Sequence, residues 1–229
     1  MDAGLRRGQT TNMDPHKTPS KQADPWTLFA ANGWGSAIVE AALTLARIPY
    51  DRVLVDPSEP GPARDRLVAV NPLAQLPTAI LPDGTPLTES AAMILLANDR
   101  APEAGLVPPA DAPERAAFLR WLVYLVAAVY PTFTYGDDPK RYVKTAPDEL
   151  RASTDAARKA MWNDLERVAG SPYFLGDRFT ALDLYVAVMT RWRPGRKWFV
   201  EACPKLTAIA QRIEARPELA SVWTLNFPG

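Results

Sequence analysis

Hydrophobic and polar residues in the first hundred positions change between the period of a strand and that of a helix. Two short apolar and β-branched runs, Trp26 to Ala30 and Tyr50 to Val55, predict strands. Between them, apolar residues recur at helical spacing from Ala37 to Arg47, which predicts an amphipathic helix. Because a helical crossover joins the two strands, they are expected to pair in parallel.

A hairpin is predicted in the stretch from 71 to 91, NPLAQLPTAILPDGTPLTESA. Thr78 to Leu81 favours one strand and Pro86 to Thr88 a second. Between them, Pro82-Asp83-Gly84-Thr85 combines a fixed φ, an Asx acceptor and a glycine able to take positive φ. Ser90 then precedes an apolar run that ends near Arg100, so we expect it to be the N-cap of a helix.

The chain divides by composition near residue 105, where a segment rich in Pro and Ala follows the third helix. Residues 1–24 lack apolar periodicity and are predicted to form a disordered tail. Residues 25–104 alternate strands and helices, as a thioredoxin-like α/β domain requires. Residues 105–229 carry helical patterns alone, which predicts an all-helical bundle. The expected helices run from Pro113 to Val129, Pro147 to Ala169, Leu182 to Arg193 and Lys205 to Ala215.

The composition excludes several kinds of chemistry. The 229 residues include 26 basic and 26 acidic side chains, and this balance offers no electrostatic footprint for nucleic acid or a membrane surface. A single cysteine, Cys203, suits a reducing cytoplasm and cannot form an internal disulfide. With one histidine, His16, in the polar tail, we expect no metal site and no Ser–His or Cys–His pair within the fold.

Pro77, Glu89 and Ser90 carry a resemblance to the glutathione transferases, in particular the bacterial-type cytosolic ones. The resemblance implies a thioredoxin-like domain followed by a helical domain, with a cis peptide bond before Pro77. Such a bond would leave the backbone N–H and C=O of Leu76 open to an added extended peptide. It also implies that Glu89 and Ser90 hold the γ-glutamyl end of glutathione.

A second signature, Leu175 to Asp183, resembles the same family and leads into an apolar helix. Thr180 as N-cap with Asp183 three residues later forms a pair similar to a capping box. The helix that follows is apolar on nearly every side and is expected to be the buried hub of the helical domain.

The loop after the first strand departs from the family pattern. The family places a Tyr, Ser or Cys there to donate a hydrogen bond to the glutathione sulfur, whereas Gly33 or Gly35 stands where serine or cysteine is expected. Ser36 and Asn32 remain as candidate donors. The alternatives are that Ser36 is an ordinary helix cap and that backbone amides stabilise the thiolate.

A second substrate is expected to be a small hydrophobic electrophile. We expect Trp34, Tyr124 and Tyr130 to line its pocket, although an aromatic stripe at helical spacing is also typical of core. The resemblance further implies a homodimer.

Three functions remain open at this point. The first is a glutathione transferase that directs the glutathione thiolate at an electrophile. The alternative is a non-catalytic glutathione-binding or protein-interaction module on the same fold, which the missing donor favours. A glutathione-dependent reductase or peroxidase is disfavoured because no cysteine lies near the predicted site to carry a mixed disulfide.

Overall fold

The computed structural model describes residues 24–228, so the predicted disordered tail lies almost wholly outside the described residues. A four-stranded sheet forms the first part of the fold. Its strands are β1 (Trp26–Ala30), β2 (Tyr50–Leu54), β3 (Thr78–Ile80) and β4 (Pro86–Leu87), in the order β2-β1-β3-β4. β1 pairs with β2 in parallel and with β3 antiparallel, so the predicted crossover is confirmed.

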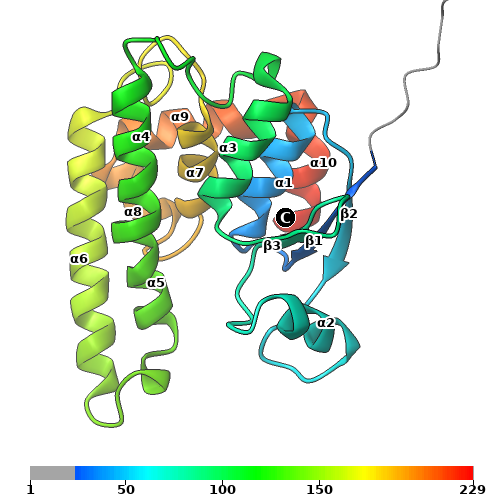
Figure 1. Cartoon of the computed structure of the whole chain (residues 1–229). Coiled ribbons are helices and arrows are strands. Elements are labelled where there is room, and N and C mark those ends of the chain that lie inside the picture. The colour runs from blue at the N-terminus through cyan, green and yellow to red at the C-terminus, as the bar shows by residue number, and fades with distance from the viewer. Residues whose placement is uncertain (1–23, 229) are drawn as a thin grey trace, which may run out of the picture.

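Helices cover both faces of this sheet (Figure 1). α1 (Ser36–Leu45) and α3 (Ser90–Arg100) lie on the face toward the rest of the molecule, and α2 (Pro62–Val70) lies on the other. On the α2 face, a small core of Phe29, Val55 and Leu67 is separate from the main one. This arrangement confirms the thioredoxin-like fold.

The second part of the chain is helical. Its elements are η1 (Pro102–Ala104), α4 (Arg115–Tyr124), η2 (Leu125–Val129), α5 (Tyr130–Asp137), η3 (Pro139–Arg141), α6 (Pro147–Val168), α7 (Ala181–Met189), α8 (Arg196–Ala202), α9 (Pro204–Glu214), η4 (Pro217–Leu219) and α10 (Ala220–Asn226). Sequence reasoning did not predict α8 or α10.

The helix predicted to end at Val129 continues through α5. η2 is a π-helical turn, and Pro131 follows it within the first turn of α5. The Tyr130 N–H donates to the Leu125 carbonyl, five residues earlier, so the usual i→i−4 pattern is already interrupted where the proline has no N–H to donate.

α7 is the buried hub that the sequence predicted, since every one of its residues is buried. Asp183 accepts hydrogen bonds from the N–H groups of Thr180 at 2.8 Å and Phe174 at 2.7 Å. The Thr180 side chain faces the N–H of Asp183, but its oxygen makes no hydrogen bond of standard geometry. The predicted pair is therefore held mainly by the aspartate.

One hydrophobic core runs through both parts of the chain. Ile38 of α1 and Met93 of α3 belong to the same buried cluster as Leu184 of α7 and Leu219 of η4. α10 returns to pack beside α1, so the last helix of the described residues lies against the first (Figure 1).

One helical stretch, Arg115–Asp137, is long and apolar enough to cross a membrane by length and composition, with a mean hydropathy of 1.5. This stretch contributes Phe118, Leu122 and Val129 to the core of the fold. Core helices of soluble proteins pass the same test, so the finding is weak support for a membrane span.

Candidate functional site

The peptide bond between Leu76 and Pro77 is cis, as the resemblance implied. Among the described residues, neither the N–H nor the C=O of Leu76 has a backbone or side-chain partner. β3 begins directly afterwards, at Thr78, which pairs with Phe29 of β1. Leu76 therefore presents an open backbone edge directly before a fixed strand.

Two buried polar residues that sequence reasoning missed hold this turn. The Asn71 amide donates to the Gln75 carbonyl at 3.2 Å and to the Thr78 hydroxyl at 2.9 Å. The Thr78 hydroxyl in turn donates to the Gln75 carbonyl at 2.8 Å. An Asn followed by Pro, seven residues before a Thr, was the available signal, but both residue types are common in turns.

Glu89 and Ser90 lie at the start of α3, but their roles in the helix start differ from the prediction. Glu89 is the N-cap residue, with φ of 66°, and Ser90 is the first helical residue. A positive φ on a residue with a side chain is uncommon and is found at functional sites. The Ser90 hydroxyl does not cap the helix; it lies 2.7 Å from the hydroxyl of Tyr185 in α7.

The structure corrects the interpretation of Ser36. Its side chain is fully buried, and its hydroxyl donates to the Ala31 carbonyl at 3.1 Å and faces the Ala31 N–H at 3.2 Å. Two backbone amides that follow Ser36, those of Ala37 and Ile38, donate to the Trp34 and Gly35 carbonyls and are not available to a thiolate. Ser36 therefore closes the loop after β1, and its hydroxyl proton is not directed at an open surface.

A charged and amide network fixes the outer side of the same loop. Glu40 is fully buried on α1, and its carboxylate lies 3.1 Å from Nε of Arg52. Burial raises the pKa of Glu40, while Arg52 and Asn226 act in the opposite direction. Asn32 was the second candidate donor, and its side-chain oxygen accepts from Arg52 at 2.6 Å. Asn32 thus faces Arg52, where it helps to hold the loop.

Two residues of the helical part form hydrogen bonds with the main chain of Gly33. The N–H of Gly33 donates to the side-chain oxygen of Asn226 at 3.2 Å, and its carbonyl accepts from the indole N–H of Trp192 at 2.7 Å. The positive φ of 74° at Gly33 explains the glycine there. Asn226 and Trp192 lie far away in sequence, so local patterns did not indicate them.

The three residues predicted to line the pocket lie in different surroundings. Trp34 is 51% exposed at the rim of the loop. Tyr124 packs on Trp121 with ring centroids 5.4 Å apart, and its pKa is raised by burial and by Asp164 of α6. Tyr130 alone reaches the cis proline region, where its hydroxyl approaches Gly35.

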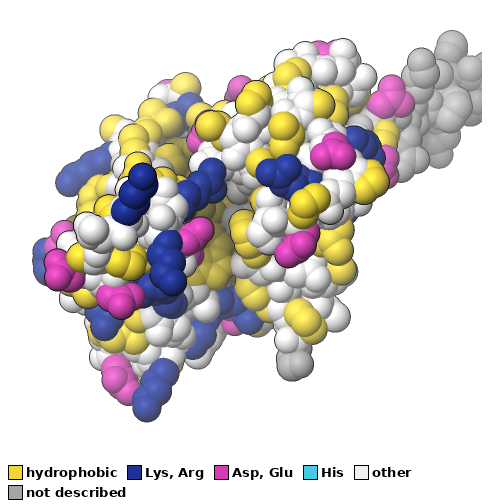
Figure 2. Space-filling view, turned by 90° about the horizontal axis from the view of Figure 1, so that it is seen from below, with side chains coloured by type: hydrophobic (Ala, Val, Ile, Leu, Met, Phe, Trp, Pro, Cys, Tyr) yellow, Lys and Arg dark blue, Asp and Glu magenta, His cyan; other side chains and the backbone are white. Residues whose placement is uncertain are grey.

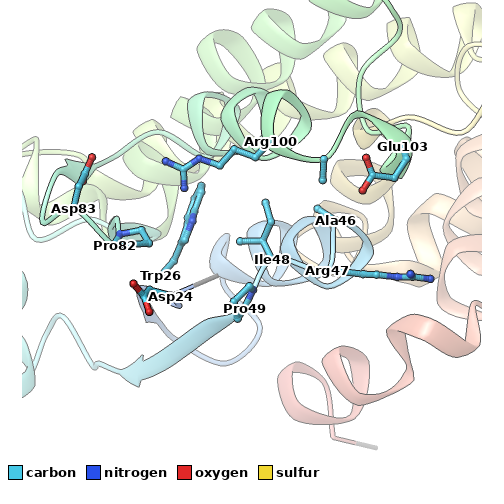
Figure 3. A pocket seen from close by; sticks show the side chains of 11 residues that line it. Asp24, Trp26, Ala46, Arg47, Ile48, Pro49, Pro82, Asp83, Arg100 and Glu103 are labelled. Carbon is cyan, nitrogen blue, oxygen red and sulfur yellow. The ribbon is translucent and has the colours of Figure 1, made fainter. Parts of the chain in front are cut away.

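Seen from below, the surface is hollowed between the helical part and the sheet, with hydrophobic side chains in the hollow (Figure 2). A different cavity, of about 510 Å³, lies beside Trp26, Ile48 and Arg100 (Figure 3). It contains none of the predicted site residues, and the charged side chains that line it are exposed. Within residues 24–228, no group of three or more His, Cys, Asp or Glu could hold a metal ion.

Two family models match this chain. One describes the glutathione S-transferase N-terminal domain and matches residues 36–100; the other describes the C-terminal domain and matches residues 128–223. The chain therefore belongs to the glutathione S-transferase family.

Individual relatives agree with this assignment. An uncharacterized GST-like protein, YncG, of Escherichia coli strain K12 is 39% identical over 87% of this chain and 97% of its own. Glutathione S-transferase GstA of Escherichia coli O157:H7 is 30% identical over 68% of this chain and 75% of its own. A glutathione transferase homologue from Sulfitobacter, solved with bound glutathione, has a TM-score of 0.77 at 29% identity and covers 86% of this chain and 96% of its own.

Proposed function

We propose that this protein binds glutathione and directs its thiolate at a small hydrophobic electrophile. The observation that carries the proposal is the open backbone edge of Leu76 at a cis proline, close to the start of α3. An extended tripeptide adds to such an edge as a short strand, with its cysteinyl residue opposite Leu76. The glutathione bound to the Sulfitobacter homologue supports this choice of ligand.

Glu89 and Ser90 then receive the γ-glutamyl end. The exposed Glu89 carboxylate pairs with the ligand ammonium, and the N-terminus of α3 with the Ser90 hydroxyl receives the ligand carboxylate. In the reaction, the sulfur lone pair forms a bond to an electrophilic carbon. The leaving group departs with the bonding electrons, or, in an addition, the substrate takes a proton from water.

Calorimetry with glutathione tests the binding half of the proposal. We expect Glu89→Gln to weaken binding by about tenfold, the loss that corresponds to about 1.4 kcal/mol for a charged hydrogen bond. Glu103→Gln removes an exposed carboxylate beside the other cavity and is the matched control. No binding by the wild-type protein, or equal losses in both variants, would overturn the proposed site.

Turnover of an aromatic electrophile with glutathione tests the catalytic half. The alternative, a glutathione-binding module without catalysis, is favoured by one observation: residue 35 has no side chain to donate a hydrogen bond to sulfur. Binding without turnover on a panel of electrophiles would support that module.

We further propose a homodimer that works in the cytoplasm. Leu119 and Val123, one turn apart on α4, are 38% and 57% exposed, which is consistent with a protein contact there. The free, buried thiol of Cys203 suits a reducing compartment. Sedimentation of wild type and Val123→Glu tests the dimer; a wild-type monomer would contradict it.

A further inference from the structure

Tyr130 carries a buried hydroxyl that has no hydrogen-bond partner among the described residues. Its ring is held edge-on against Trp192, at 5.5 Å between centroids, and against Tyr185, at 6.5 Å. A buried hydroxyl without a partner costs about 1–3 kcal/mol, so each such group in a folded protein needs an explanation, and a catalytic role is one of them. The Tyr130 hydroxyl is therefore available to donate a hydrogen bond to an acceptor on a bound ligand.

The position of this hydroxyl matches the donor that the loop lacks. A Cβ atom built on Gly35 would lie 2.4 Å from the Tyr130 oxygen, 3.4 Å from its Cζ and 3.6 Å from Cδ of Pro77. Gly35 has φ of −58°, which any residue adopts, so its backbone does not demand a glycine. The phenol oxygen fills the space into which a side chain at residue 35 would project.

The backbone around Tyr130 has an irregular conformation that positions its ring beside Gly35. Tyr130 is the first residue of α5 and directly follows the π-helical turn η2. π-helical turns are rare and occur frequently at functional sites. The Thr132 hydroxyl donates to the Val129 carbonyl at 2.6 Å, a side-chain-to-backbone bond of the kind that Thr makes within helices.

We propose that the Tyr130 hydroxyl donates the hydrogen bond that stabilises the glutathione thiolate, in place of a side chain at residue 35. This inference rests on the proposed function. The thiol proton passes to solvent water, and the phenol keeps its own proton. Since the oxygen is covered by its neighbours, the ring or the Gly35 loop moves slightly when sulfur takes up the contact.

The surroundings keep Tyr130 in the donor form. Burial, and next the neighbouring Tyr185, raise the pKa of Tyr130 well above its ordinary value, so the phenol stays protonated at neutral pH. The main-chain N–H groups of Gly35 and Ser36, at the start of α1, have no acceptor among the described residues. The positive N-terminal end of the α1 dipole would stabilise the thiolate together with the phenol O–H.

The test compares Tyr130→Phe with wild type in three measurements: glutathione affinity by calorimetry, thiolate absorbance of bound glutathione against pH, and the pH profile of kcat/KM. We expect affinity to change less than threefold. The thiolate pKa should rise by about 1–2 units, which lowers kcat/KM near neutral pH by about 10- to 100-fold. Tyr135→Phe removes a phenol oxygen from the exposed side of the same helix and should leave all three values unchanged.

A second variant tests the geometry by rescue. Gly35→Ser alone puts its Cβ against the Tyr130 oxygen, but in Gly35→Ser/Tyr130→Phe the nearest ring carbon lies at 3.4 Å, an ordinary contact. The double variant should recover at least part of the lost thiolate signal, because the hydroxyl now comes from residue 35. Rescue would support the inference even if Tyr130→Phe alone is less stable.

The outcomes separate this inference from the proposed function. If wild type binds glutathione and the bound thiolate titrates identically in Tyr130→Phe, the inference is overturned while the glutathione site stands. If wild type binds no glutathione, the proposed function fails first. Equal effects in Tyr130→Phe and Tyr135→Phe would show a loss of folding in place of a lost donor, and would overturn the assignment.

Discussion

Hydroxyl groups in the interior connect the predicted ligand residues to the helical hub. Ser90 contacts the hydroxyl of Tyr185, and the Tyr185 ring packs edge-on against Tyr130. Tyr130 in turn touches the loop beside Pro77. The Ser90 and Gly35 contacts join the first part of the chain to the second, and the Tyr130–Tyr185 contact links them within the helical part, so the site depends on both parts.

If Ser90 binds glutathione as proposed, the contact makes Tyr185 a positioning residue for Ser90. We expect Tyr185→Phe to lower glutathione affinity by about 3- to 10-fold, because the Ser90 hydroxyl loses the partner that orients it. The thiolate pKa should not change, unlike in Tyr130→Phe. Calorimetry on Tyr185→Phe, Ser90→Ala and the double variant gives the coupling between the two residues. Fully additive losses would contradict a role for Tyr185 through Ser90.

Asp183 makes the stability of the fold depend on pH. Burial raises its pKa from 3.8 to about 7 in spite of hydrogen bonds from Phe174 and Thr180. Between these values the unfolded state has released the proton that the folded state keeps, so stability falls as pH rises. Asp183→Asn lacks this titration. The stability of wild type relative to Asp183→Asn should therefore decrease between about pH 4 and pH 7 and level off above.

Urea unfolding of both proteins at a series of pH values checks this expectation. Near pH 5 the variant should be less stable by about 1–3 kcal/mol, because its amide N–H₂ faces backbone donors. Asp177→Asn makes the same chemical change at an exposed position in the loop before α7 and should cost less than about 0.5 kcal/mol. A stability difference independent of pH would show that Asp183 is ionised throughout.

At the scale of elements, α10 fixes the loop after β1 through the hydrogen bonds of Asn226. Asn226 accepts from the Gly33 N–H and donates to Glu40 at 3.3 Å. We expect Asn226→Ala to destabilise the protein by about 1–3 kcal/mol and to speed hydrogen exchange at Gly33. Thr224→Ala, at an exposed position of the same helix, is the control. Unchanged exchange at Gly33 would show that the loop holds itself.

Elements with local causes could be predicted from the sequence. β1 and the hairpin follow from apolar runs and the Pro-Asp-Gly-Thr turn, where Asp83 accepts from the Thr85 N–H at 2.9 Å. α8 and α10 were missed because each has only 7 residues, too few to show a period. The continuation through Pro131 was missed because a proline usually ends a helix.

The same division applies to the candidate site. Pro77, Glu89 and Ser90 were indicated by their spacing along one stretch of chain. The burial of Ser36 against Ala31 and the approach of Tyr130 to Gly35 depend on tertiary packing between segments far apart in sequence. Periodicity indicates which residues lie on one face of a helix, but it carries no signal for what that face will contact.

At the scale of the whole molecule, the two sequence domains share one core. α1 packs on α7 and α10, and its buried residues belong to the cluster that contains the residues of α9. A sheet with two helices on that face would expose this surface if it folded alone. We therefore expect the two parts to unfold together in one cooperative transition.

A core substitution in the helical part tests this cooperativity. Leu206 on α9 is fully buried, and Leu206→Ala should destabilise the protein by about 2–5 kcal/mol. If unfolding is cooperative, the slowest-exchanging amides of β1, at the other end of the chain, should lose the same free energy of protection as those of α7. Glu201→Ala, at an exposed position of α8, should alter neither set. A loss of protection confined to α7 and α9 would mean that the two parts unfold separately.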